Sequence, residues 1–317
     1  MSTVRSKKGG PAPTVGIIQT KIFGLPIDRD ILFSNHKNVY KKSIEKRQRK
    51  LFLKLPFLKN FLHPGEKILV VTTGYSPVTS LQKFIVGWLF IYLKRSLYVF
   101  TDHRLLHIPA DARYRYRNSI AEIPYNGCRS LEMKGNALMV EYTGNHTREK
   151  FGGFAGKEKR KVRELIKTLR LTGGQQSADG RSFLCPRCAA PLTPIHKACE
   201  SCRLKFKQKI PATILALLIP GGGYFYTRHL FLGVMAAILE LGLGAVIVLS
   251  AVDIADGIQD RFLWLVPTFL ALLIQKMVAV AHAREFIDEY IPTTQNISPM
   301  PASRRRKEAQ AKPAGAV

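Results

Sequence analysis

The sequence has few acidic residues for its length and contains none of the short motifs that mark common catalytic sites. Its 317 residues include 49 Lys and Arg but only 22 Asp and Glu, a net charge of +27. It has no Gly-x-Ser-x-Gly motif, no phosphate-cradling P-loop and no His-Glu pair. An enzyme needs a nucleophile with a base, paired carboxylates or an open metal site. We therefore expect a protein that binds and does not catalyse.

The charge is distributed unevenly along the chain. Residues 1–210 contain 40 of the 49 Lys and Arg and 14 of the 22 Asp and Glu, whereas residues 211–284 contain four basic and four acidic residues. The chain therefore divides into a basic soluble part and a nearly neutral apolar part. Residues 1–15 are small and polar, are predicted to be disordered, and lack the apolar core of a secretory signal. We expect the basic part to stay on the cytoplasmic side of a membrane.

Two apolar runs, residues 230–250 and 262–283, each have about the 20 residues that a helix needs to cross a bilayer. They predict a transmembrane hairpin over residues 228–284. The connector carries three aspartates, whereas "RLKFKQK" precedes the first run and "SRRRK" follows the second. By the positive-inside rule, both termini then lie in the cytoplasm, where residues 285–317 form a mostly disordered tail.

Glu240 and Lys276 lie near the middle of these two runs. Counted from the connector, their depths differ by about 6 Å, because a helix rises about 1.5 Å per residue, and a lysine side chain can bridge that difference. Ionisable groups at such depth indicate a functional or structural role. A structural ion pair is the first interpretation, and a proton or ion pathway in an oligomer is the alternative.

A shorter apolar stretch precedes the hairpin. Residues 212–219 are too few to cross a bilayer, and Pro220 followed by three glycines breaks any helix there. Residues 211–227 are therefore predicted to form a re-entrant or interfacial segment. The arrangement is similar to a family of paired-transmembrane-helix domains with a basic, glycine- and aromatic-rich loop. The comparable residues are Gly223, Phe225, Tyr226, Arg228 and Gly233.

Four of the five cysteines form two C-x2-C pairs separated by ten residues: Cys185, Cys188, Cys199 and Cys202. Two such turns facing each other supply a tetrahedral site of four thiolates. Residues 185–207 are therefore predicted to fold around a structural Zn²⁺, because so short a segment cannot fold on apolar burial alone. Rubredoxin-like iron and a redox dithiol are the competing interpretations. A reducing cytoplasm favours metal binding over disulfides.

The cysteine segment resembles the short zinc-ribbon family found in many prokaryotic membrane-tethered proteins, through "FLCPRCAAPL" and "KACESC". The resemblance implies binding to a protein or to nucleic acid. A site closed by four protein ligands has no open coordination position, which argues against zinc catalysis.

Residues 62–171 contain several short alternating segments with turn signals between them, then the amphipathic stretch "GKEKRKVRELIKTLRL". The order of "HPGEKILVV", "SLYVFTDHRLLHIP" and this closing helix resembles the bacterial pleckstrin-homology-like domain family. The resemblance implies a small antiparallel β-barrel capped by a helix, which binds lipid, peptide or a second copy of itself.

Two segments favour contact with anionic lipid. Residues 16–61 are basic and partly amphipathic, and a charged helix packed on the next domain is the alternative there. Residues 82–95 form an apolar insertion too short to span a bilayer. In the membrane-dipping interpretation its aromatic side chains reach headgroup depth and its basic ones meet phosphates, whereas an ordinary buried helix or strand is the alternative. The lipid-contacting residues named by this interpretation are Lys83, Trp88, Lys94 and Arg95.

The "RYRYR" stretch offers a second anion-binding candidate. If it is extended, Arg113, Arg115 and Arg117 share one face, because side chains alternate along a strand. These arginines then hold a phosphate-bearing headgroup or stack on single-stranded RNA, whereas a solvated loop that binds no ligand is the alternative. Residues 172–184 are predicted to be a flexible linker by composition.

Taken together, the sequence predicts an α+β multidomain membrane protein with a β-barrel, a zinc ribbon and a transmembrane hairpin. The expected function is that of a non-enzymatic adaptor of the bacterial inner membrane that binds anionic lipids or an unidentified protein partner. A membrane-held nucleic-acid-binding protein and a subunit of an oligomeric channel or transporter are the alternatives. Homo-oligomerisation is left open.

Overall fold

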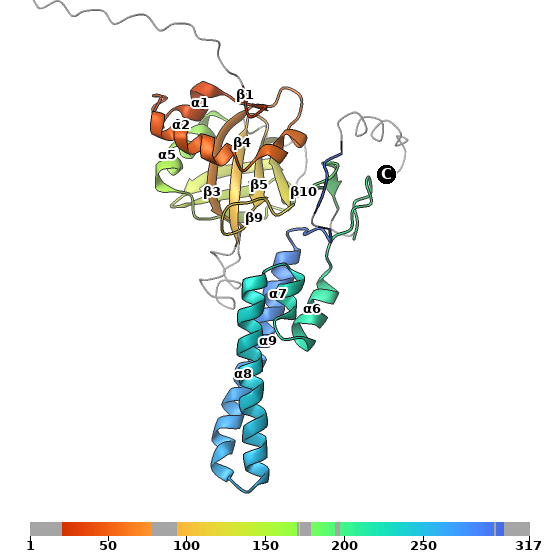
Figure 1. Ribbon diagram of the computed structural model, residues 1–317. Coiled ribbons are helices and arrows are strands. Elements are labelled where there is room, and N and C mark those ends of the chain that lie inside the picture. Colours follow the sequence, from red (N-terminus) through yellow and green to blue (C-terminus); the bar gives the residue numbers. More distant parts are fainter. Residues whose placement is uncertain are drawn as a thin grey trace, which may run out of the picture.

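Antiparallel sheets at one end and a long pair of helices at the other make up the computed structural model (Figure 1). It describes residues 21–77, 94–169, 171, 179–193, 197–294 and 296–300. Lys83 and Trp88, the expected disorder of residues 1–15 and most of the expected C-terminal tail lie outside the described residues.

The larger sheet has six strands in the order β11-β10-β6-β5-β4-β3, and all of its pairings are antiparallel. The Thr101 hydroxyl accepts the Arg104 N–H at 3.0 Å, which closes the turn between β4 and β5. The strands are β3 (Ile68–Tyr75), β4 (Arg95–Thr101), β5 (Arg104–Pro109), β6 (Ile120–Pro124), β10 (Ser182–Leu184) and β11 (Pro191–Leu192).

A second sheet contains β7 (Cys128–Lys134), β8 (Ala137–Tyr142) and β9 (Arg148–Phe151), in that order. Helix α5 (Gly156–Thr168) buries Val162, Leu165 and Ile166 in the core that both sheets share. An isolated bridge between Tyr75 and Gly152 joins the two sheets at one corner.

The expected closed barrel is wrong. The 3₁₀ turn η2 (Tyr125–Gly127) carries the chain from the six-stranded sheet into the three-stranded one, and β6 and β7 are not hydrogen-bonded neighbours. Instead, the edge of β6 that would close a barrel pairs with β10, whose residues come from the end of the predicted linker. The paired edge no longer offers free backbone groups, so the sheets stay open as two layers.

The basic N-terminal segment packs its apolar face on the larger sheet. It contains β1 (Lys21–Ile22), β2 (Leu25–Pro26), α1 (Arg29–Phe33), α2 (Lys42–Phe52) and the 3₁₀ helix η1 (Pro56–Asn60). Phe52 and Leu58 are fully buried in one cluster with sheet residues Val71 and Val99. Burying each such side chain stabilises the fold by about 1.5–3 kcal/mol. The apolar side of α2 is therefore unavailable to a bilayer, and the packed alternative is the observed arrangement.

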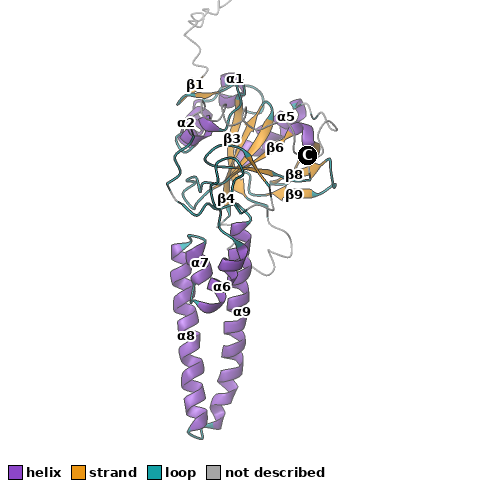
Figure 2. Ribbon diagram, turned by 90° about the vertical axis from the view of Figure 1, so that its right-hand side faces the viewer, coloured by secondary structure: helices purple, strands orange, loops and turns teal. Residues whose placement is uncertain are grey.

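Helices α8 (Leu230–Ala255) and α9 (Phe262–Ile287) form an antiparallel pair that extends away from the sheets (Figures 1 and 2). Each has 26 residues and is therefore about 39 Å long, compared with about 30 Å for the hydrocarbon core of a bilayer. The 3₁₀ turn η3 (Gln259–Arg261) joins them, and Arg261 pairs with Asp253 at 3.0 Å there. Among the described residues, these two helices are long and apolar enough to cross a membrane.

Two shorter helices, α6 (Lys209–Leu218) and α7 (Gly222–Tyr226), lie against the end of this pair nearest the sheets (Figure 2). The chain reverses between them at Gly221, which has a φ of +65°. A Cβ on Gly221 would lie 2.1 Å from the Gly233 carbonyl oxygen, so only glycine fits this turn. Residues 211–227 therefore form a helical segment that advances along α8 and α9 and then turns back.

Candidate metal centre and its junction with the helices

The two C-x2-C pairs form turns with the same backbone pattern. The Cys185 carbonyl accepts the Ala189 N–H at 2.8 Å, and the Cys199 carbonyl accepts the Arg203 N–H at 2.8 Å. Ala189 and Arg203 both adopt left-handed backbone conformations, with φ of 60° and 57°. Each turn thus places two cysteines of one pair on the same side, and the fifth residue of the turn bends the chain away from them.

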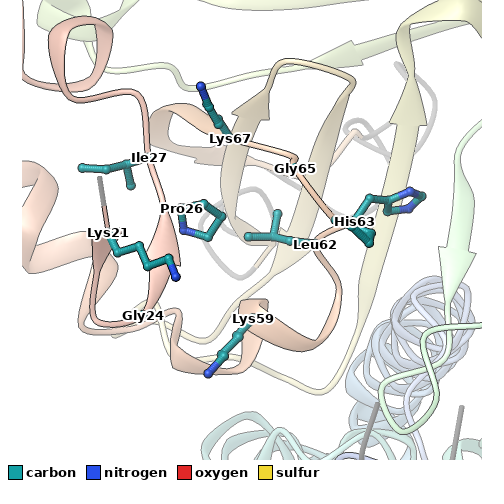
Figure 3. Close-up of a pocket in the computed structure, with 10 residues that line it drawn as sticks. Lys21, Gly24, Pro26, Ile27, Lys59, Leu62, His63, Gly65 and Lys67 are labelled. Carbon is teal, nitrogen blue, oxygen red and sulfur yellow. The ribbon is translucent and has the colours of Figure 1, made fainter. Parts of the chain in front are cut away.

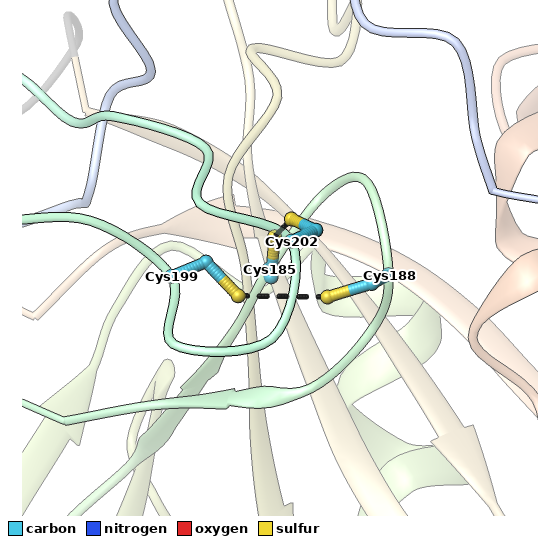
Figure 4. A group of neighbouring side chains, drawn as sticks. All are labelled: Cys185, Cys188, Cys199 and Cys202. Atoms are coloured by element: carbon cyan, nitrogen blue, oxygen red, sulfur yellow. Dashed lines mark hydrogen bonds between the residues drawn. The ribbon is translucent and has the colours of Figure 1, made fainter. Parts of the chain in front are cut away.

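The two turns face each other and bring four sulfur atoms together (Figure 4). All four Sγ atoms lie within 4.8 Å of one another, and those of Cys185 and Cys202 and of Cys188 and Cys199 are 3.5 Å apart. Four sulfurs at about 2.3 Å from a tetrahedral Zn²⁺ would be about 3.8 Å apart, so these residues fit such an ion. Iron in a tetrahedral thiolate site fits the same geometry, so the donor set alone does not identify the metal.

The segment of residues 182–207, which we call the ribbon, is docked on both of its sides. Its first strand, β10, continues the larger sheet through β6. On the other side, Phe206 forms a bridge with Pro292, and Tyr290 lies 4.7 Å from the Phe183 ring. The last three residues of the predicted linker thus belong to a sheet, and residues 172–178 lie outside the described part of the chain. The four-cysteine cluster is built into the junction between the sheets and the chain that follows α9.

Charged groups connect the sheets directly to α9 and to the start of α8. Lys94 is buried, and its Nζ lies 3.1 Å from Glu285 Oε2 and 3.8 Å from Glu289 Oε1. Arg117 donates to His229 Nε2 at 2.9 Å, and its guanidinium lies 5.6 Å from the Phe286 ring centre. Burial, with a contribution from Arg117, holds the pKa of His229 well below its ordinary value. His229 is therefore a neutral acceptor.

The "RYRYR" stretch is not an extended strand, and the expectation of one shared arginine face is wrong. The Asp111 carboxylate accepts the N–H groups of Arg113 and Arg115, each at 2.8 Å, and Tyr114 has a φ of 57°. This local turn leaves Arg113 and Arg115 exposed, whereas Arg117 points into the helix junction.

Lys94 and Arg95, both predicted to contact lipid phosphates, are engaged within the protein. Lys94 pairs with α9 as described, and Arg95 donates to the Ala112 carbonyl at 2.7 Å. The guanidinium of Arg95 also lies 5.4 Å from the ring centre of Tyr114. Both side chains thus contact groups of the protein, and Lys94 is buried.

Glu240 and Lys276 are in contact. The Lys276 Nζ lies 2.7 Å from Glu240 Oε2, and the Glu240 side chain is 2% exposed. The same carboxylate oxygen accepts the Gly221 N–H at 3.3 Å, and Lys276 donates to the Ala216 carbonyl at 3.2 Å. Ala216 needs this donor because residue 220, four positions later, is a proline without an N–H. The pair thus ties the broken α6–α7 segment to α8 and α9.

Open concavities lie on the sheet-containing part, and two of them carry basic side chains from different elements. Figure 3 shows the first, of about 570 Å³, where Lys59 and Lys67 extend in opposite directions away from Pro26 and Leu62. The second, of about 830 Å³, lies between α2 and α5. Sequence reasoning missed this α2–α5 cleft, because its basic residues come from segments more than 100 positions apart. They are Lys41, Arg47, Arg160 and Lys161.

Comparison with known proteins identifies no family for the chain. No protein-family model matches the chain, and no curated protein matches it. The pleckstrin-homology-like, zinc-ribbon and paired-helix resemblances therefore remain expectations, beside an observed four-cysteine cluster, an antiparallel sheet domain and two apolar helices.

Proposed function

We propose that this protein is a non-enzymatic adaptor of a bacterial inner membrane, in which α8 and α9 cross the bilayer. The exposure of their apolar side chains carries the proposal. Of the most apolar 18-residue stretch in each helix, 17% is buried within the protein in α8 and 6% in α9. A core helix of a soluble protein is mostly buried, whereas Phe231 and Leu263 here are 77% and 79% exposed. A continuous apolar surface of this length supports contact with the hydrocarbon core of a bilayer.

The charges at the two ends of the helical pair support one orientation. Asp253, Asp256 and Asp260 lie at the connector end, whereas Lys205 and Lys207 precede α6 and Lys209 begins it at the other end. By the positive-inside rule, the sheets, the ribbon and both termini then face the cytoplasm. In this orientation α6 and α7 enter the cytoplasmic half of the bilayer and return.

The way in which the parts are joined supports an adaptor role. The Lys94 and Arg117 contacts fix the sheets to the helices, and the ribbon adds a second attachment through β10 and the chain after α9. A structural Zn²⁺ at the four cysteines would make the ribbon rigid without opening a catalytic position. The result is a basic domain and a metal-folded surface held at one height above the bilayer, ready for a protein partner or anionic lipid.

The adaptor role is tested by chemical crosslinking in intact membranes, followed by copurification. The variant Cys185→Ser/Cys188→Ser removes one half of the metal site, and Cys128→Ser is the matched control because it replaces a buried cysteine outside the ribbon. We expect wild type and control to capture the same discrete partner and the ribbon variant to lose it, with all three found in the membrane fraction. A partner pattern unchanged by the ribbon variant, or no captured partner, refutes the role.

A further inference from the structure

We infer that the α2–α5 cleft binds a phosphate-bearing ligand. This site goes beyond the adaptor role, and only the assignment of its ligand to solution rests on the proposed membrane location. The volume of about 830 Å³ lies within the range of about 300–1,000 Å³ that is typical of small-molecule sites. The walls are the connection between α1 and α2, the first turns of α2, and the first turn of α5.

The polar groups on the floor of the cleft contact other groups of the protein. Glu158 is the one acidic residue among the described residues that line it, and its Oε1 lies 2.6 Å from Arg47 Nη2. The Thr72 hydroxyl donates to the other oxygen of Glu158. Lys161 donates to the Leu32 and Ser34 carbonyls, at 2.9 and 2.6 Å, at the end of α1. The floor therefore presents fixed groups, and the Glu158 carboxylate is paired with an arginine.

The rim of the cleft carries positive charge from Lys41, Arg47 and Arg160. Lys41 and Arg160 lie on opposite walls, and their side chains make no hydrogen bond or ion pair with any residue that the structure describes. Arg47, with 37% of its side chain exposed, keeps donors free beyond the Glu158 contact. Three basic side chains around one concavity match the oxygens of a phosphate group, to which they make charge-assisted hydrogen bonds.

The two helices that form the walls add to this positive potential. Both α2 and α5 begin at the cleft, and neither has a side-chain hydrogen bond at its N-cap, which is Lys41 in α2 and Ala155 in α5. Lysine and alanine are poor N-caps, because neither offers an oxygen to the free N–H groups of the first turn. An anion in the cleft supplies the missing acceptors and interacts favourably with both helix dipoles.

The position of the cleft indicates a ligand from solution. Both views place α1, α2 and α5 in the part of the sheet domain remote from α8 and α9 (Figures 1 and 2). The bilayer proposed for those helices would therefore lie at the opposite end of the domain. A phosphate on a lipid headgroup has the same chemistry, however, so the experiment includes both sources.

The test is calorimetric titration of the full-length protein with inorganic pyrophosphate, in nanodiscs of phosphatidylcholine. A parallel arm measures flotation of the same nanodiscs with phosphatidylcholine vesicles that contain phosphatidic acid. The cleft variant is Lys41→Gln/Arg160→Gln. Its matched control is Lys50→Gln/Arg163→Gln, which removes the same charges from exposed positions of the same helices outside the cleft. Circular dichroism checks that both variants fold.

We expect saturable pyrophosphate binding by wild type and control, weakened at least about tenfold in the cleft variant. Flotation lost in the cleft variant alone, without pyrophosphate binding, assigns the phosphate to a lipid. Equal weakening in both variants would mean that binding reflects diffuse surface charge, which overturns the inference. Absence of both kinds of binding in wild type overturns it as well.

Discussion

Replacing Lys276 by methionine isolates the polar contact that holds the broken α6–α7 segment against the long helices. The substitution leaves the Glu240 carboxylate buried, with the Gly221 N–H as its one remaining partner among the described residues. Removing one partner of a buried ion pair costs about 3–5 kcal/mol of the free energy of unfolding. It also leaves the Ala216 carbonyl without the donor that replaces the missing proline N–H.

The companion variant, Glu240→Gln/Lys276→Met, removes both charges of the ion pair at once. The glutamine oxygen can still accept the Gly221 N–H, and no buried charge remains, so the remaining loss is the Ala216 carbonyl, about 1–3 kcal/mol. We therefore expect the double variant to be more stable than Lys276→Met. In a double-mutant cycle the coupling between the two sites should reach about 2 kcal/mol.

The assay is reversible unfolding in mixed micelles of dodecylmaltoside and dodecyl sulfate, followed by far-ultraviolet circular dichroism. Gln275→Met is the control, because it removes a polar side chain from the adjacent position of α9. It should change the free energy of unfolding by less than about 0.5 kcal/mol. Costs of Glu240→Gln and Lys276→Met that add within about 0.5 kcal/mol would refute the reasoning, because independent sites behave in that way.

Three further outcomes follow from the fold. Phe52→Ala should lower the free energy of unfolding, measured by thermal denaturation, by about 3–5 kcal/mol, because this side chain of α2 is fully buried. An unchanged midpoint would contradict the packing of α2 on the sheet and favour its location at the bilayer surface. Burial raises the pKa of Glu66, but bonds from Arg104 and the His63 N–H outweigh it and hold that pKa below its ordinary value. The ionised Glu66 carboxylate therefore stabilises the fold above about pH 4.3, and this stabilisation is lost as the pH falls through the lower pKa of the folded state. In urea titrations, the difference in free energy of unfolding between wild type and Glu66→Gln should therefore shrink in acid. A difference that stays constant with pH would contradict this. Cys188→Ser should abolish metal binding, measured by elemental analysis, and should increase hydrogen exchange in β10. The reason is that binding of a structural Zn²⁺ contributes about 10–16 kcal/mol to the folding of small zinc domains. Metal retained by the variant would contradict the four-cysteine site.

Features set by local spacing could be predicted from the sequence. The two C-x2-C pairs specify their own turns, so the four-cysteine cluster follows from the spacing alone. The lengths of the apolar runs identify the two long helices, because bilayer thickness translates directly into residue number. The contact between Glu240 and Lys276 follows from the constant rise of an α-helix.

Features set by distant contacts could not be predicted. The basic, amphipathic pattern of α2 is the same for a helix on a membrane and for one packed on a sheet, and only the contact with β3 decides between them. The alternation in "RYRYR" suggests a strand, but the Asp111 side chain and the burial of Arg117 override it. Barrel closure fails because β10, about 60 residues away, takes the edge of β6.

The central claim is that α8 and α9 cross a bilayer and place the sheets and the ribbon on one side of it. The most direct measurement is labelling of Asp256→Cys and Lys50→Cys with a membrane-impermeant maleimide in intact spheroplasts and in inverted membrane vesicles, with wild type as the background. We expect Asp256→Cys, in the connector, to react only in spheroplasts, and Lys50→Cys, in α2, to react only in inverted vesicles. Reaction of both positions from the same side would contradict the claim.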